Sequence, residues 1–269
     1  MSDPDPQRKE VFERGAAYEP YVGRWSRRVA PEFLAWLNVP PGKRWLDVGS
    51  GTGALSQTIL RTRDPLSVTG VDRSDGFVAY AREQVQDERV EFRVGDAQEL
   101  PVETAAFDAA VSGLVLNFVP QPQRAVDEMA RAVKPGGTAA LYVWDYADRM
   151  QFMRYFWDAA AEVDPKAAEL DVGSRFWLCN PDGLTGLFQA ARLNDIQVRA
   201  IDIPTVFQNF DDFWTPFLGG QGSAPTYVAS LSDELRADLR DLLKFRLPTA
   251  SDGSIPLVAR AWAIRGTRA

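Results

Sequence analysis

The sequence predicts an α/β fold with a mostly parallel seven-stranded sheet that contains one antiparallel strand. From residue 44 onward, short apolar runs rich in β-branched residues alternate with stretches of helical periodicity. This alternation is typical of parallel strands joined by right-handed helical crossovers. The last apolar run, residues 257–264, is expected to pair with the run before it and to form an antiparallel edge.

The elements follow one another in a regular order. Val29, Phe33, Trp36 and Leu37 share one helical face, so a helix is expected to lead into the sheet. Apolar runs predict strands at residues 44–48, 67–71, 90–94, 107–112, 138–144, 195–203 and 257–264. Helical spacing predicts the intervening helices at residues 54–61, 76–84 and 123–133.

Two helix boundaries carry specific signals. Asn180 is a favoured N-cap residue and Pro181 suits the first turn, so a further helix is expected to begin there. The Pro-Gly-Gly sequence at residues 135–137 is expected to end the helix before it and to turn the chain into the next strand.

The composition restricts the classes of function. The formal net charge is -7 at pH 7, so the chain lacks the cationic field that a nucleic-acid or anionic-membrane binder needs. Cys179 is the only cysteine, which excludes an internal disulfide and favours a cytoplasmic location. No apolar run is long enough to cross a bilayer. The chain has no histidine, so it lacks the commonest general base and metal ligand, and no metal site is expected.

A glycine-rich turn follows the first predicted strand. Gly49, Gly51 and Gly53 alternate with Ser50 and Thr52, and the chain then enters a helix. Glycine at such a turn lets the backbone approach a ligand where a Cβ atom would collide. The nicotinamide-binding turn has two residues between its second and third glycines, whereas this turn has one. The turn therefore predicts a small-molecule site that differs from the usual dinucleotide site.

Four motifs together resemble those of the class I S-adenosylmethionine-dependent methyltransferases. They are residues 46–53, 71–72, 95–97 and 133–137, and their order and intervals are also similar to those of the family. The resemblance covers residues 18–144 and is greatest to the small-molecule branch that includes the ubiquinone and menaquinone biosynthesis methyltransferases. It implies a Rossmann-like class I methyltransferase fold, S-adenosylmethionine (SAM) as cofactor and S-adenosylhomocysteine (SAH) as product.

The resemblance also implies roles for individual residues. Asp72, after the second strand, would accept hydrogen bonds from both ribose hydroxyls. Asp96 would accept from the adenine amino group, while the N–H group of Ala97 would meet a ring nitrogen. Taken alone, Asp72 also fits a helix cap and Asp96 an ordinary turn.

Three further segments complete the expected cofactor site. Arg73 and Phe77 would flank the adenine and residues 112–114 would line the methionine arm, unless they are simply surface and core. Residues 18–27 would fold over SAM, with Tyr18 and either Arg24 or Arg27 holding its carboxylate. The alternative is that this segment packs its aromatic side chains on the core. The residues expected to bind the cofactor are Tyr18, Arg27, Asp47, Gly49, Ser50, Gly51, Gly53, Asp72, Arg73, Asp96, Ala97, Ser112 and Gly113.

Two stretches fall outside the alternation and are expected to be helical lid insertions over the carboxyl edge of the sheet. The full division is an N-terminal segment and helix at 1–40, a SAM-binding half of the core at 41–145, a helical insertion at 146–178, a core helix and strand at 179–206, a helical lid insertion at 207–254 and a final core strand at 255–269.

The insertions are rich in aromatic residues, which predicts an apolar acceptor pocket and a small hydrophobic or aromatic substrate. These residues are Phe152, Tyr155, Phe156, Trp157, Phe176, Trp177, Phe207, Phe210, Phe213, Trp214, Phe217 and Tyr227. The alternative is that most of the rings form the insertions' own core.

Methyl transfer from a sulfonium is a direct displacement, so the protein mainly supplies proximity and orientation, and no residue is assigned as a catalytic base. Two other functions stay open at this point. One is a nicotinamide-dependent oxidoreductase, against which stand the glycine spacing and the missing histidine. The other is a SAM-binding protein without turnover. The acceptor atom and the oligomeric state are left undetermined.

Overall fold

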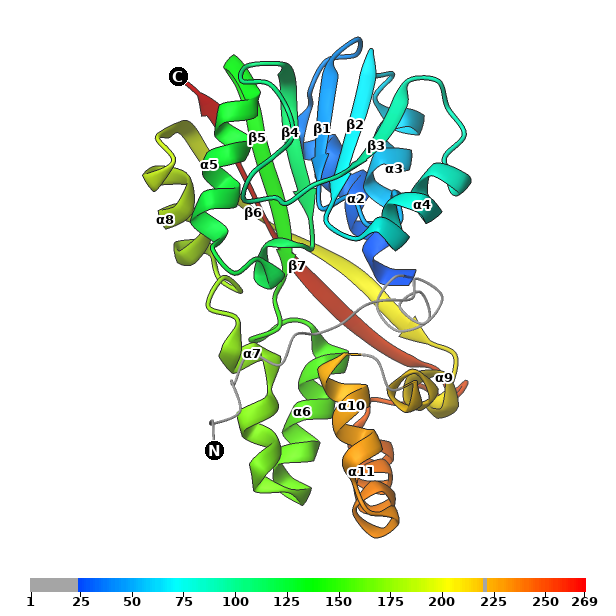
Figure 1. Ribbon diagram of the computed structural model, residues 1–269. Helices are drawn as coiled ribbons and strands as arrows, with labels where there is room; N and C mark the ends of the chain where they lie inside the picture. The colour runs from blue at the N-terminus through cyan, green and yellow to red at the C-terminus, as the bar shows by residue number, and fades with distance from the viewer. Residues whose placement is uncertain (1–23, 220–221) are drawn as a thin grey trace.

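The computed structural model describes residues 24–219 and 222–269. Seven strands form one sheet in the order β3-β2-β1-β4-β5-β7-β6 (Figure 1). The strands are β1 Arg44–Val48, β2 Ser67–Asp72, β3 Val90–Val94, β4 Phe107–Gly113, β5 Val133–Trp144, β6 Leu193–Phe207 and β7 Ile255–Arg268. Only β7 runs against its neighbours, which confirms the predicted mostly parallel sheet with one antiparallel strand.

The position of β7 corrects one detail. It pairs with β6, as expected, but it also pairs with β5, so it lies inside the sheet and β6 forms the edge. Both strands are longer than predicted at each end. β6, for example, continues through Pro204 to Phe207. Proline lacks an N–H donor and is therefore tolerated on an edge strand, where one side has no partner.

Helices cover both faces of the sheet. The helices α2 Arg24–Leu37, α3 Ala54–Thr62 and α4 Asp75–Gln84 pack on one face. On the other face lie α5 Pro122–Ala132 and α8 Pro181–Ala190. Asn180 caps α8 by accepting the N–H of Gly183 at 2.9 Å, as predicted. Two buried apolar clusters result, one on each side of the sheet.

The Pro-Gly-Gly sequence behaves differently from the prediction. Residues 135–137 lie inside β5, where the pairing with β4 shifts register between Phe107 and Ala109. Gly136 has a φ of 76°, a conformation that glycine adopts without strain. The chain is therefore kinked within the strand instead of turning before it.

The remaining helices lie beyond the carboxyl edge of the sheet, at the far end of the long β6–β7 pair (Figure 1). We call them the helical lobe. Its members are α6 Gln151–Val163, η3 Pro165–Leu170, α7 Val172–Arg175, α9 Phe210–Trp214, η4 Thr215–Leu218, α10 Ser223–Ser230 and α11 Asp233–Arg246. Two separate stretches of chain thus build one lobe around a shared apolar interior.

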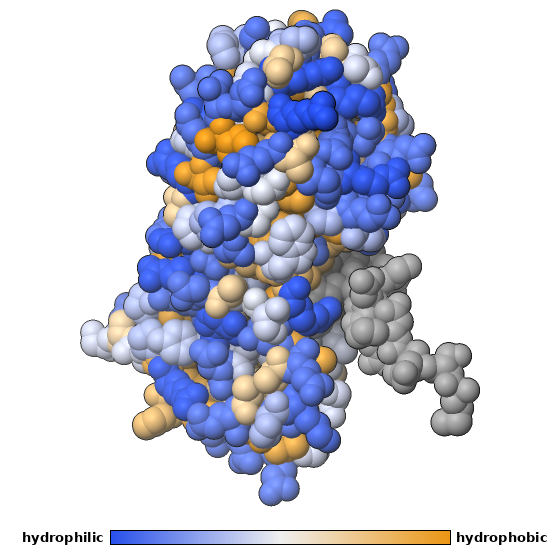
Figure 2. Space-filling view, turned by 90° about the vertical axis from the view of Figure 1, so that its left-hand side faces the viewer, coloured by the Kyte–Doolittle hydropathy of each residue, from blue (hydrophilic) through white to orange (hydrophobic). Residues whose placement is uncertain are grey.

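Within residues 24–219 and 222–269, no helix has the length and apolar character needed to span a membrane. On the face shown in Figure 2, hydrophobic residues form small separate groups among hydrophilic ones.

Candidate active site

The glycine turn closes the carboxyl end of β1, and its three glycines have positive φ angles of 72°, 53° and 85°. The N–H groups of Gly49 and Ser50 both donate to the carbonyl of Val71, at 2.7 and 3.0 Å, which fixes the turn against β2. L side chains rarely adopt these φ values, so glycine is needed for the backbone path itself.

The three glycines meet different surroundings. A Cβ atom on Gly49 would lie 2.5 Å from Val115, and one on Gly53 would lie 3.0 Å from Val85. A Cβ atom on Gly51 would meet nothing within 4 Å, because Gly51 borders a cavity. Gly51 is therefore the glycine that leaves room for a ligand. Gly53, expected in the cofactor site, does not line the cavity and instead lets the start of α3 pack closely.

Asp72 ends β2 directly beside this turn. Its carboxylate accepts the N–H of Gly51 at 2.9 Å and the N–H of Ser74 at 2.9 Å. Ser74 is the N-cap of α4, because its hydroxyl accepts the N–H of Phe77 at 3.3 Å. Asp72 is therefore not the cap itself, and its carboxylate retains lone pairs at the cavity wall.

Asp47 is the most deeply buried carboxylate of the cavity, with 1% of its surface exposed. One oxygen accepts the hydroxyl of Ser56 at 2.6 Å, whereas the other has no hydrogen-bond partner. Burial raises the pKa of Asp47 to about 7, although the bond from Ser56 opposes this shift. The hydroxyl of Ser50, also buried and on the cavity wall, likewise lacks a partner.

Asp96 follows β3 at the other end of the cavity. Its carboxylate accepts the backbone N–H of Gln98 at 2.8 Å and the side-chain amide of the same residue at 3.0 Å. These bonds, led by the backbone one, lower the pKa of Asp96. Ala97, Gln98 and Arg73 also line this end.

The end of β4 meets β5 at Gly113, which pairs with Tyr142. A Cβ atom on Gly113 would lie 2.6 Å from the hydroxyl oxygen of Tyr142, so only glycine lets the phenol come this close. Gly113 and Tyr142 both line the cavity. Ser112 does not, because it is buried and donates its hydroxyl to the carbonyl of Val48 at 2.8 Å.

The cavity that these residues share has a volume of about 520 Å³. Of the thirteen residues expected to bind the cofactor, nine line it: Asp47, Gly49, Ser50, Gly51, Asp72, Arg73, Asp96, Ala97 and Gly113. Besides Gly53 and Ser112, Arg27 does not line it and is exposed on α2. Arg24 also points elsewhere, to Asp212 at 2.8 Å. Tyr18 lies outside the described residues.

The part of the chain that forms most of this edge is similar to a known protein domain. Residues 46–141 match the family model of the methyltransferase domain. These residues are therefore similar to the methyltransferase domain, and they contain the four motifs on which the sequence resemblance rested. The match covers every motif that the cavity uses except the N-terminal helix and the last residues of β5.

Two sequence relatives of this chain carry different substrate names. A phosphatidylethanolamine N-methyltransferase of Cereibacter sphaeroides is 36% identical over 134 residues, which are 48% of this chain and 64% of that protein. A 2-methyl-6-phytyl-1,4-hydroquinone methyltransferase of Oryza sativa subsp. japonica is 34% identical over 120 residues, which are 44% of this chain and 34% of that protein. The chain thus spans less than two thirds of the length of each.

Among solved structures, phosphoethanolamine N-methyltransferase 2 of Haemonchus contortus, in complex with S-adenosyl-L-methionine, aligns with a TM-score of 0.59. The alignment covers 97% of the present chain and 58% of that chain, at 20% identity. At that identity, the alignment shows that the two chains share a fold and no more than that.

The structure corrects the expected acceptor wall. None of the twelve aromatic residues expected there lines the cavity. Instead, most of the rings pack on one another inside the helical lobe, whereas Trp177 is exposed. Phe156, for example, stacks on Phe217 at 4.4 Å between centroids. The prediction was wrong because helical spacing of aromatic residues marks a buried face without indicating what covers it. The closest link is Phe176, which lies edge-on to the cavity residue Phe118 at 5.4 Å.

Several cavity residues escaped the sequence analysis, among them Ala30, Gln98 and Tyr142. Gln98 adjoins a recognised motif and could have been included on that basis. Tyr142 could be found only from the pairing of β4 with β5, because its position within an apolar strand looks like ordinary core.

Proposed function

We propose that this protein is a methyltransferase that transfers the methyl group of SAM to a small hydrophobic or aromatic acceptor. The observation that carries the proposal is the order of groups along the carboxyl edge of the sheet. Charged residues border the cavity at the ends of β3, β2 and β1, and uncharged ones border it at β4 and β5. A ligand that is polar at one end and reactive at the other fits this gradient.

The charged end suits the donor. We place the adenine beside Asp96, the ribose beside Asp72 and the methionine amino group beside Asp47, in the order of the strands. A buried polar atom without a partner is uncommon in native proteins. The free oxygen of Asp47 therefore supports this placement, because an ammonium group would satisfy it. When bound, SAM supplies a methyl group that is already activated by its sulfonium.

The uncharged end suits the acceptor. Leu114, Val115 and Phe118 from the segment after β4, with Ala30 from α2, give it an apolar wall. The hydroxyl of Tyr142 adds a polar group at the same end. We propose that the apolar wall orients the acceptor and excludes water while the Tyr142 hydroxyl holds its nucleophilic group.

Charge distinguishes the substrate classes named for the relatives. A phosphorylated acceptor would need cationic partners. Arg73 is the only lysine or arginine among the described residues that line the cavity, and it stands at the end assigned to adenine. A neutral acceptor such as a hydroquinone therefore fits better than a phosphorylated amine.

A nicotinamide dinucleotide fits this cavity poorly. Its pyrophosphate would lie at the glycine turn, where Gly51 already donates its N–H to the carboxylate of Asp72. Asp47 and Asp96 add two further acidic groups to the same cavity. Like charges at close range disfavour binding, so a dianionic group would be repelled.

A SAM-binding protein without turnover would share the donor site. It would differ from an enzyme only in failing to methylate an acceptor.

Calorimetric titration with SAM, SAH and NAD tests the donor, and we expect the first two to bind and NAD not to bind. Binding of NAD alone would reject the proposal.

Incubation with SAM and either hydroquinones or phosphoethanolamine, followed by mass spectrometry, tests the acceptor. We expect SAH release and methylated product with a hydroquinone. If SAM binds but no acceptor in either class is methylated, the binding protein without turnover becomes the better description.

A further inference from the structure

The segment between β3 and β4 departs from the alternation of strands and helices. Residues 95–106, all of them described, contain turns and one isolated bridge between Asp96 and Glu99 but no helix. Three residues of this segment, Asp96, Ala97 and Gln98, nevertheless form one end of the cavity. Because the segment has little hydrogen bonding of its own, its conformation depends on what it contacts.

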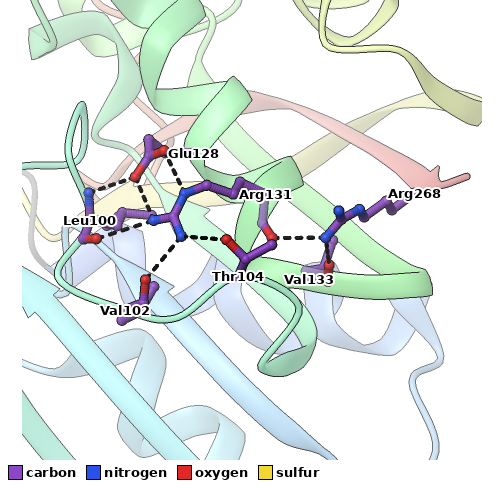
Figure 3. A network of polar contacts seen from close by, with 7 residues as sticks. All are labelled: Leu100, Val102, Thr104, Glu128, Arg131, Val133 and Arg268. Carbon is purple, nitrogen blue, oxygen red and sulfur yellow. Dashed lines mark hydrogen bonds and ion pairs between the residues drawn. The ribbon is translucent and has the colours of Figure 1, made fainter.

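Two charged residues of α5 hold this segment in place (Figure 3). The guanidinium of Arg131 donates to the carbonyls of Leu100 and Val102, at 3.2 and 3.0 Å, and to the hydroxyl of Thr104 at 3.1 Å. The carboxylate of Glu128 accepts the N–H of Leu100 at 2.8 Å and binds Arg131 through both oxygens at 2.7 Å. Planar, two-pronged bonding of this kind fixes geometry as well as adding energy.

Gln98 connects the clamped segment to the cavity. Its side-chain oxygen accepts the N–H of Gln121, the residue before α5, at 3.0 Å. Its side-chain nitrogen donates to both oxygens of Asp96, at 3.0 and 3.2 Å, and its backbone N–H donates to the same carboxylate at 2.8 Å. One amide group thus ties the start of α5 to the carboxylate at the end of β3.

We propose that Gln98 is a positioning residue that orients Asp96 toward the adenine amino group, and that Glu128 and Arg131 hold the segment from which it acts. This inference rests on the proposed function, which places adenine beside Asp96. Asp96 is exposed, and an exposed carboxylate otherwise samples several rotamers. Fixing it before the ligand arrives removes an ordering cost from binding.

The test compares two ligands, SAH and its inosine analogue, in which an oxo group replaces the adenine amino group. Removing the bonds to a charged group should weaken SAH binding to Gln98→Ala by about tenfold. The analogue should be affected little, because it lacks the amino group that Asp96 receives. Gln86→Ala is the matched control, since Gln86 is an exposed glutamine that bonds only to carbonyls of its own helix.

The second arm is a double-mutant cycle with Asp96→Asn. If Gln98 acts through Asp96, adding Gln98→Ala to the Asp96→Asn variant should cost no further SAH affinity. Equal losses for SAH and the analogue, or additive losses in the cycle, would show that Gln98 only stabilises the segment and would overturn the inference. Failure of the parent protein to bind SAH would overturn the proposed function as well, so the two failures are distinguishable.

Arg131→Lys tests the clamp, because lysine keeps the charge but lacks the planar fork of five N–H donors that spans the carboxylate and the carbonyls. We expect faster hydrogen exchange at the amide of Leu100 together with weaker SAH binding. Faster exchange with unchanged SAH affinity would reject the role of the clamp in ligand binding.

Discussion

The carboxyl edge of the sheet and the helical lobe differ in how their interiors are filled. At the edge, buried polar atoms of Asp47 and Ser50 lack partners, and Gly51 faces open space. In the lobe, large rings fill the interior; Phe156 and Phe217 have 0% and 1% of their surface exposed. The edge thus leaves room for a ligand beside unpaired polar atoms, whereas the interior of the lobe is filled by its own rings.

This difference shows which features mark a ligand site. Aromatic residues are more numerous in the lobe than at the edge, and the sequence made the lobe look like a substrate pocket. Rings that satisfy one another through stacked and edge-on contacts leave no surface for a ligand. Unsatisfied polar atoms that border a cavity are the more specific signal, since Nε1 of Trp157 in the lobe also lacks a partner but borders no part of this cavity.

The largest expected effect is a loss of stability on truncation of a buried ring in the lobe. Phe156→Ala would remove a ring that stacks on Phe217 and meets Trp157 edge-on at 5.1 Å. Truncating a buried phenylalanine costs about 3–5 kcal/mol of unfolding free energy. We expect a loss of that size in chemical denaturation, with SAH affinity unchanged at temperatures where the variant is folded.

Phe245→Ala is the matched control, because Phe245 belongs to the same lobe but is 87% exposed. Surface substitutions of this kind stay within about 0.5 kcal/mol. A fall in SAH affinity with Phe156→Ala but not with Phe245→Ala would break the comparison, since it would make the lobe part of the donor site.

The next effect comes from filling the space beside Gly51. In Gly51→Val the new side chain would project into the cavity, where nothing lies within 4 Å, and would occupy the place of the ligand. Overpacking of this kind costs about 1–3 kcal/mol, so SAH affinity should fall by about 100-fold in calorimetry.

Gly136→Val separates this steric effect from backbone strain. Gly136 also has a positive φ, 76°, and no neighbour within 4 Å of a Cβ atom, but it lies in β5 away from the cavity. Both variants should lose stability to a similar degree, while only Gly51→Val loses SAH affinity. Equal affinities would remove Gly51 from the ligand site.

Features of the fold that depend on residues close in sequence were predicted well, and features that depend on distant residues were not. Strand β1 was placed at its observed bounds, and the cap of α8 at Asn180, because hydrophobic runs and caps depend on neighbours in sequence. The insertion of β7 between β5 and β6 was missed, since partner choice among strands depends on the whole sheet. Likewise, the kink at Gly136 looked like a turn because only the pairing with β4 keeps the chain in a strand.

The same distinction applies to the residues of the site. Asp47, Gly51, Asp72 and Asp96 belong to motifs with a fixed place at strand ends, so the sequence predicted them, and all four line the cavity. Ser112 also follows from the resemblance, but its side chain points into the core, and the direction of a side chain near a strand end depends on the register of the neighbouring strands.

The smallest expected effect concerns the pH dependence of donor binding at the edge. Burial raises the pKa of Asp47 to about 7, so its carboxyl group is mostly neutral at pH 6 and mostly ionised at pH 8. The ammonium group of SAH binds the ionised form, and its affinity should therefore rise by about tenfold from pH 6 to pH 8. Binding at pH 6 should release about one proton, measured from the dependence of the calorimetric enthalpy on the buffer. Asp47→Asn should abolish both the proton release and the rise in affinity. A parent protein whose SAH affinity is constant across this range would show that the free oxygen of Asp47 faces no cation, and the methionine arm would have to lie elsewhere in the cavity.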